Sequence, residues 1–74
     1  MAQYRCTVVI ERDEDGYFAF CPQLQGCYAQ AETYEDVLAE IRDALHLHIE
    51  DRLQSGEEIP QDLSVSLTSL EVTV

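Results

Sequence analysis

The segment Asp13-Glu14-Asp15-Gly16 constrains the fold most strongly, because it separates two runs of residues that favour β-strands. Gly16 reaches positive φ without strain and Asp15 tolerates it, so Asp-Gly at this place is a strong signal for a β-hairpin. The chain is therefore expected to reverse here. The reversal predicts three cross-strand pairs, which are Arg12 with Tyr17, Ile10 with Ala19, and Val8 with Cys21.

Two further signals bound the other strands of the sheet. Residues 4–12 alternate between two faces, as a strand with one buried face does. Pro22 has no backbone N–H donor and ends the second strand, and Gly26 lets the chain turn again into a third strand that begins at Cys27. These runs predict a three-stranded antiparallel meander. We expect another surface to cover its reverse face, where Val9, Phe18 and Phe20 lie.

An amphipathic helix is predicted from about Tyr34 to Gln54. Thr33 is a suitable N-cap residue, and Asp36 adds a carboxylate to the first turn, where the helix dipole favours negative charge. Gly56 follows the last periodic residue and is expected to stop the helix. Placing residues 100° apart collects one apolar stripe. The stripe consists of Tyr34, Val37, Leu38, Ile41, Ala44, Leu45, His48 and Ile49.

The last residues are expected to return as a fourth strand, but their apolar phase changes. Apolar side chains occupy odd positions from Leu63 to Leu67 and even positions from Leu70 to Val74. Either a β-bulge near Ser69 turns both sets toward one core, or the last residues leave the sheet and pair with another chain. We favour the second alternative, because neither Pro nor a cluster of charges protects this segment as an exposed edge.

The expected fold class is α+β with the order βββαβ. One helix packs on one face of the sheet. The rule of right-handed crossovers places the last strand parallel to strand one and gives the sheet order 3-2-1-4. We expect residues 1–74 to form a single domain, and a core this small favours association with another chain.

The charge of the chain excludes some partners. Fifteen acidic and four basic residues give a formal net charge of −11, and the basic residues are isolated arginines. Without a cluster of cations, direct binding to nucleic acid is not expected. The negative field attracts a basic protein, although a role in solubility is the simpler explanation of the charge. The sequence has neither a membrane span nor a secretory signal, so we expect a cytoplasmic protein that binds no membrane.

The sequence predicts no catalytic site, no metal site and no cofactor. The three cysteines contain no C-x-x-C pair and are expected to be buried thiols, although a bridge from Cys21 to Cys27 is conceivable. The acids of the hairpin turn are typical of a solvated turn and do not resemble the converging carboxylates of a two-metal nuclease. We therefore expect no enzymatic activity.

The two histidines are not expected to share a metal ion. His46 and His48 lie two positions apart, which separates them by about 160° around a helix. His48 falls at the edge of the apolar stripe and is expected to pack there. His46 is placed to form a surface ion pair with Asp43 or Glu50.

The stretch from Tyr4 to Leu53 resembles the HicB-like antitoxin domain. The resemblance lies in the order and spacing of an opening strand, D-E-D-G-Y, C-P-x-L-x-G-C, T-x-E-D and an amphipathic helix, and it covers roughly two thirds of the chain. It implies a partial ribonuclease H-like fold with the same βββαβ order. It also implies an antitoxin that binds and masks a small basic toxin, which cleaves messenger RNA.

Two departures from the family limit what the resemblance implies. Ala31 stands where the family usually has Gly, just before the helix. Longer members carry a C-terminal helix-turn-helix or ribbon-helix-helix segment that binds DNA, whereas this sequence ends at Val74 with the expected fourth strand. We therefore expect no C-terminal DNA-binding segment.

Three functions follow from these observations. The leading hypothesis is a non-enzymatic antitoxin of a HicAB-type toxin-antitoxin system. The alternative is a stand-alone oligomeric scaffold or ligand-binding domain of the same fold without a toxin partner, and a degenerate hydrolase is a minor third. We expect a homodimer or higher homo-oligomer that forms through the last strand. The predicted contacts with a partner or a second copy are Val9, Phe18, Phe20, Leu47, Leu70, Val72 and Val74.

Overall fold

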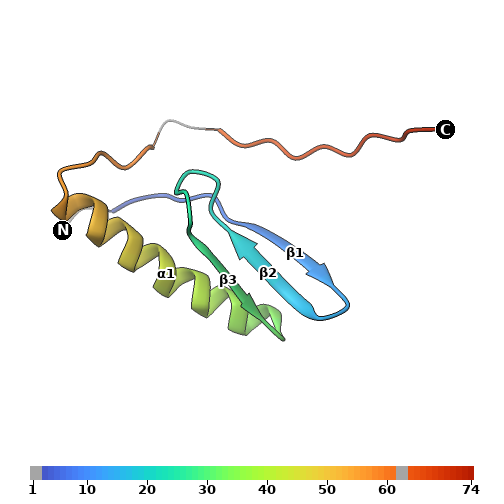
Figure 1. Ribbon diagram of the computed structural model, residues 1–74, viewed down its shortest axis with the longest axis horizontal. Coiled ribbons are helices and arrows are strands. Elements are labelled where there is room, and N and C mark those ends of the chain that lie inside the picture. Colours follow the sequence, from blue (N-terminus) through green and yellow to red (C-terminus); the bar gives the residue numbers. More distant parts are fainter. Residues whose placement is uncertain (1–2, 62–63) are drawn as a thin grey trace.

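The fold is a three-stranded antiparallel sheet with one helix on one face, as Figure 1 shows for the computed structural model. The structure describes residues 3–61 and 64–74. The sheet order is β1-β2-β3, and the α+β class agrees with the sequence prediction. The elements are β1 (Val9–Asp13), β2 (Gly16–Phe20), β3 (Tyr28–Ala31) and α1 (Tyr34–Gln54).

The hairpin between β1 and β2 forms as the sequence predicts. The carboxylate of Asp13 accepts a hydrogen bond from the Asp15 N–H at 2.8 Å, which fixes the turn. Gly16 adopts a φ of +134°, and a Cβ atom there would lie 2.6 Å from the carbonyl oxygen of Ala31. Glycine is thus required both by the turn and by the close approach of β3. The predicted pairs Arg12 with Tyr17 and Ile10 with Ala19 are confirmed.

The first strand is shorter than predicted. It begins at Val9, so the expected pair of Val8 with Cys21 is not part of the ladder. The reason is that side-chain amides replace strand partners before Val9. The Thr7 N–H donates to Gln23 Oε1 at 2.8 Å. The Arg5 N–H donates to Gln61 Oε1 at 3.0 Å, and Gln61 Nε2 donates back to the Arg5 carbonyl at 3.1 Å.

The loop between β2 and β3 consists of two consecutive turns. The Leu24 N–H donates to the Cys21 carbonyl at 3.2 Å, and the Cys27 N–H donates to the Leu24 carbonyl at 3.2 Å. Pro22 occupies the first turn, and Gly26 with a φ of +84° occupies the second. The two turns direct the Leu24 side chain inward, where it is 1% exposed. This loop leucine belongs to the core, although the sequence pattern places it only in a connection.

Both ends of α1 have the capping interactions that the sequence indicates. The Thr33 hydroxyl accepts from the Asp36 N–H at 3.1 Å. At the other end, Gly56 has a φ of +78° and its N–H donates to the Leu53 carbonyl, while the Glu57 N–H donates to the Arg52 carbonyl. This pair of bonds is a Schellman motif. The predicted bounds of the helix are therefore confirmed.

The core lies between α1 and the inner face of the sheet. Val37 and Ile41 from the predicted stripe are buried, whereas Tyr34 and Leu38 at its beginning are 46% and 36% exposed. The helix lies over β2 and β3 rather than over β1. The first strand is therefore an edge of the sheet that the helix does not cover. The buried residues are Ala19, Cys21, Leu24, Cys27, Val37 and Ile41.

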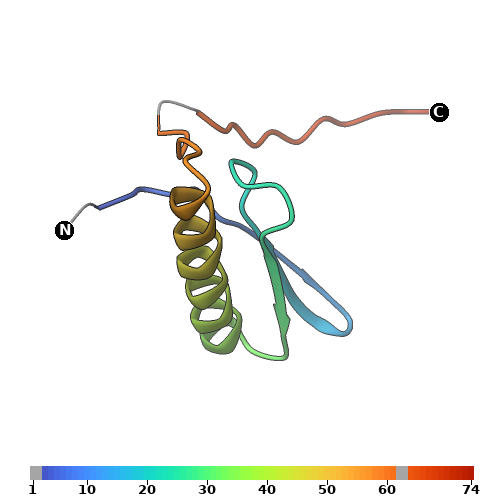
Figure 2. The same ribbon diagram turned by 60° about the vertical axis from the view of Figure 1, so that its left-hand side comes forward.

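The fourth strand expected parallel to β1 is not formed by the described residues 64–74 of the single chain. These residues run as an extended segment that joins none of the three strands, and both views show it leading away from the sheet and the helix (Figures 1 and 2). Leu63, which the prediction includes, lies outside the described residues. The sheet order of the chain is thus 3-2-1, without the predicted fourth member.

The three cysteines are free thiols in the structure. Cys21 and Cys27 are buried, as predicted, and Cys6 is half-buried. Burial raises the pKa of the Cys6 and Cys27 thiols above the ordinary value, and the neighbouring Cys21 adds to both rises. These thiols are therefore protonated at neutral pH.

Substitution by Ala is expected to cost more stability at Gly16, in the hairpin turn, than at Gly56, after the end of α1. Gly16→Ala adds a Cβ atom against the Ala31 carbonyl and also strains φ, so we expect the free energy of unfolding to fall by about 3 kcal/mol. Gly56→Ala is the control, because a Cβ there has no atom within 4 Å, and it should cost only about 1 kcal/mol. Urea denaturation measures both. Equal losses would show that the approach of β3 to Gly16 does not constrain the turn.

The raised thiol pKa values predict a loss of stability in alkaline solution. Above the unfolded pKa of about 8.5, the unfolded chain releases protons that the folded Cys6 and Cys27 retain, so the free energy of unfolding falls as the pH rises. Urea denaturation at pH 7.5 and pH 9.5 with a reducing agent measures the change. Cys6→Ala should weaken the dependence. A stability that is constant or rises over this range would contradict the account.

Candidate protein-binding surfaces

The sheet face opposite α1 carries a cluster of aromatic rings. Ala19 points toward the helix, so its neighbours Phe18 and Phe20 point to the other side. Val9 is the cross-strand partner of Phe20, and Tyr28 is its partner on β3. The Phe18 ring lies 5.9 Å from the Phe20 ring and 6.0 Å from the Tyr28 ring. We call Val9, Phe18, Phe20 and Tyr28 the aromatic face.

The aromatic face is open in the single chain. Tyr28 is 63% exposed, and the other three residues are half-buried. Among the described segments, α1 lies on the opposite side of the sheet and residues 64–74 lead away (Figure 2). Contiguous aromatic side chains outside a core are typical of a protein–protein contact. This face is therefore the strongest candidate for an interaction surface.

Tyr28 belongs to the aromatic face, although the sequence analysis does not include it among the predicted contacts. The predicted set contains Val9, Phe18 and Phe20, and the structure brings these three together. The pairing of Tyr28 with Phe20 adds the fourth member. The signal was present in the sequence, because β3 alternates and the outward position of Tyr28 follows from its register with β2.

A second candidate surface is a hollow of about 560 Å³ between the hairpin turn and the start of α1. The Tyr17 and Tyr34 rings meet there edge to face at 6.0 Å, and the Arg12 guanidinium lies 5.8 Å from the centre of the Tyr17 ring. We call this region the acidic hollow. The carboxylates that line it are Asp13, Glu14, Asp15, Glu32 and Glu35.

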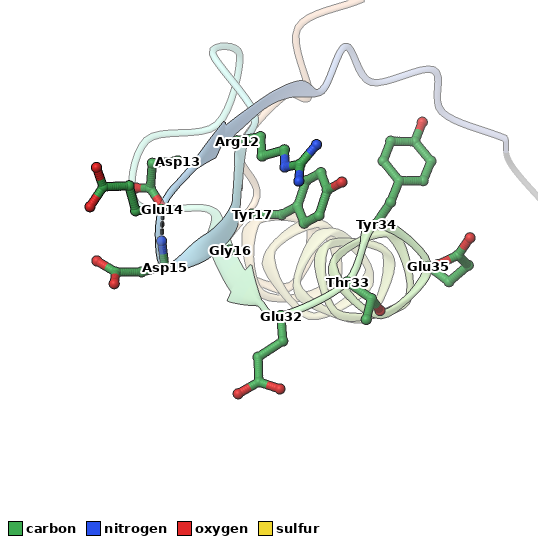
Figure 3. Close-up of a pocket in the computed structure, with 10 residues that line it drawn as sticks. All are labelled: Arg12, Asp13, Glu14, Asp15, Gly16, Tyr17, Glu32, Thr33, Tyr34 and Glu35. Carbon is green, nitrogen blue, oxygen red and sulfur yellow. Dashed lines mark hydrogen bonds between the residues drawn. The ribbon is translucent and has the colours of Figure 1, made fainter.

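The carboxylates of the acidic hollow do not converge. Figure 3 shows Glu14 and Asp15 pointing away from Glu32 and Glu35. Within residues 3–61 and 64–74, no group of three or more His, Cys, Asp or Glu side chains is placed to hold a metal ion. The hollow can instead act through its field, because five carboxylates surround a single guanidinium.

The predicted contact Leu47 lies apart from the aromatic face. It is 65% exposed on α1, beside His48 and Asp51. Since the helix covers the inner side of the sheet, Leu47 and the aromatic face belong to different surfaces. A single exposed leucine of this kind is common on soluble proteins.

The histidines of α1 have the separate surroundings that their spacing predicts. His46 Nε2 lies 2.9 Å from the Glu50 carboxylate, one of the two partners expected for it. His48 Nδ1 lies 3.2 Å from Arg52, whose guanidinium also donates to the Gln25 carbonyl at 3.2 Å. His48 and Arg52 thus connect the helix to the β2–β3 loop.

The remaining predicted contacts lie in the C-terminal segment. Leu70, Val72 and Val74 are 84%, 77% and 117% exposed. Figure 1 shows the segment 64–74, to which they belong, leading away from the sheet and from α1. The seven predicted contacts therefore occupy three separate places. Only the aromatic face is assembled by the fold of a single chain.

In the part of the chain that the structure describes, no helix has both the length and the apolar character needed to cross a bilayer.

The chain is similar to several proteins from bacteria and archaea. A UPF0150 protein of Synechocystis sp. is 39% identical over 71 residues, which cover 93% of this chain and 90% of that protein. A UPF0150 protein of Thermoplasma acidophilum is 38% identical over 63 residues, which cover 84% and 91%. A UPF0150 protein of Helicobacter pylori is 51% identical over 43 residues, which cover 58% and 60%.

A solved structure has the same fold. It is a chain of a HicA3 and HicB3 toxin-antitoxin complex, with a TM-score of 0.60 and 21% sequence identity over 80% of this chain and 72% of the matched chain. The model of a protein family described as the HicB-like antitoxin of bacterial toxin-antitoxin systems matches residues 6–72. The match covers the sheet, the helix and most of the C-terminal segment, and the chain belongs to the HicB-like antitoxin family.

Proposed function

We propose that this protein is a non-enzymatic antitoxin that binds and masks a small basic toxin, one that cleaves messenger RNA in the cytoplasm. The observation that carries the proposal is the aromatic face, which the single helix leaves open in a chain of net charge −11. Membership of the HicB-like family supports it. The partial ribonuclease H-like character of the fold is part of the same proposal.

The aromatic face supplies the affinity in this proposal. Phe18 and Phe20 are held by the ladder and by their ring contacts, so little side-chain freedom is lost when a partner covers them. Aromatic side chains are enriched among residues that dominate binding energy. Glu11 lies opposite Phe18 and places a carboxylate at the border of the face, where it suits a basic partner.

In this proposal the negative charge of the chain raises the rate at which it associates with the basic toxin. The acidic hollow and the other exposed carboxylates attract a cation from a distance, and this attraction weakens as salt screens it. The carboxylates of the hollow point apart, which favours steering over the chemistry of a nuclease. In this proposal the antitoxin therefore inhibits the toxin by covering part of the toxin surface.

A stand-alone oligomeric scaffold is the second candidate function. The exposed apolar residues of the segment 64–74 favour self-association in either case. The two candidate functions differ in whether the protein binds a toxin. A scaffold forms its oligomer but does not rescue cells from a toxin that is encoded beside it.

The aromatic face predicts the effect of substitution on neutralisation. The Phe18→Ser/Phe20→Ser variant should weaken toxin binding roughly 30-fold or more, because it removes about 2 kcal/mol or more of buried aromatic contact. Calorimetry with the purified toxin from the neighbouring reading frame measures affinity, and growth of cells expressing both proteins measures rescue.

Tyr4→Ser is the matched control for this experiment, because Tyr4 is an aromatic residue 36% exposed that lies near His46 and Glu50, outside both candidate surfaces. It should preserve rescue. Circular dichroism establishes that each variant is folded. Full rescue by the folded double variant would show that the toxin does not use the aromatic face.

The acidic hollow predicts a change in association rate. The Glu14→Gln/Glu32→Gln/Glu35→Gln variant should associate with the toxin about 10-fold more slowly at low salt and dissociate at the wild-type rate, because rim charges act on encounter. Surface plasmon resonance at 50 mM and 500 mM salt measures both rates. Glu57→Gln/Glu58→Gln, outside the hollow, is the control. An unchanged association rate in the triple variant would contradict the steering role.

A further inference from the structure

The outer edge of β1 lacks a neighbouring strand among the described residues. The strand pairs with β2 on one side and with no strand of the described residues on the other. The helix lies over β2 and β3, so the flank of Ile10 and Val8 that points to the helix side remains half-exposed. An edge strand of this kind offers unpaired backbone groups beside apolar side chains.

The segment 64–74 has the pattern of a strand, because apolar side chains alternate with Ser, Thr and Glu along it. It is extended, contains no Pro and carries a single charge, on Glu71. Apolar side chains occur on one face before Ser69 and on the other face after it. Such a segment is an aggregation hazard if it stays in water, so it requires a partner.

The exposed fraction of the side chains rises along this segment, because the chain moves away from the folded domain. Val65 is 38% exposed, and Leu67 is already 79% exposed. The Gln61 side chain bonds to Arg5, which holds the chain near the beginning of its own β1, yet residues 64–74 do not turn back along that strand. The described residues 64–74 are therefore extended and unpaired within one chain.

We infer that residues 70–74 pair with the free edge of β1 in a second copy of this chain, and that the two copies exchange these arms reciprocally. Residues 70–74 and β1 (Val9–Asp13) have equal lengths of five residues. Leu70, Val72 and Val74 then cover Ile10 on the helix side, where α1 does not reach. The phase change at Ser69 then marks the beginning of the residues that pack on the second copy.

Charge favours this contact over other surfaces for self-association. Two copies of net charge −11 repel each other, and residues 70–74 bring only one charged side chain, Glu71, to the contact with β1, whose own charges are Glu11, Arg12 and Asp13. A specific interface buries roughly 1,200 Å² or more of surface in total. In a two-fold symmetric dimer both arms bind, so the buried area is twice the area that one arm covers. Phe18, Phe20 and Tyr28 lie on the side of the sheet opposite the side of Ile10 that the arm covers, so the exchange leaves these three rings of the aromatic face free.

Light scattering after gel filtration tests the inference with the full chain at 5 to 200 µM. The wild-type protein should have twice the mass of one chain. The Leu70→Asp/Val72→Asp variant should have the mass of one chain while it retains the helical circular dichroism signal. Ser66→Asp/Thr68→Asp adds the same charge at polar positions of the same segment that lie outside residues 70–74, and it should remain a dimer. A monomeric wild type, or a dimer that the charged Leu70 and Val72 variant preserves, would overturn the inference.

Isotope-filtered nuclear Overhauser spectra of mixed ¹³C-labelled and unlabelled wild-type chains test the exchange without a variant. We expect contacts between Ile10 and Leu70 or Val72 methyl groups from different chains. If these contacts arise only within one chain, the segment forms an ordinary fourth strand and the exchange is excluded.

Discussion

The packing of one helix across two strands determines the rest of this structure. Val37 and Ile41 of α1 pack with Ala19 of β2 in the small core. This contact buries the inner face of β2 and β3, but it covers neither the outer face of the sheet nor the edge of β1. A chain of 74 residues has no second helix in its described part with which to cover them. Both open surfaces result from the packing of α1 over β2 and β3 alone.

The two open surfaces differ in chemistry, which suits them to different partners. The aromatic face consists of rings in mutual contact and is bordered by the Glu11 carboxylate, which suits a basic protein. The β1 edge offers backbone groups and the flank of Ile10 to an extended segment. A protein with both surfaces can assemble with its own copies and still bind a different partner.

Local signals in the sequence predicted the parts of the fold that depend on backbone chemistry. Asp15-Gly16 predicted the register of the hairpin, because Gly16 adopts the positive φ that the turn after Asp13 requires. Thr33 and Gly56 predicted the ends of α1, because caps act over a few residues. The family resemblance also came from this ordered set of turns and caps.

Features that depend on distant contacts were harder to predict. Leu24 is buried because two turns fold the loop onto the core, and its spacing carries no periodic signal. The first strand starts late because the side chains of Gln23 and Gln61 bond to the backbone of Thr7 and Arg5, which precede it. Alternation along residues 63–74 predicted a fourth strand, whereas the described residues 64–74 pair with no strand of the chain. Of the candidate contacts, alternation placed Val9, Phe18 and Phe20 on one face, whereas Leu47 showed no relation to them.

The central claim is that α1 shields only one side of the sheet and that a protein partner covers the other. Relaxation of ring protons by a soluble gadolinium chelate tests it directly, with and without the toxin. The account predicts strong relaxation of the Phe18, Phe20 and Tyr28 rings in the free protein and its loss in the complex. Rings that are already protected in the free protein, or that remain accessible in the complex, would contradict it.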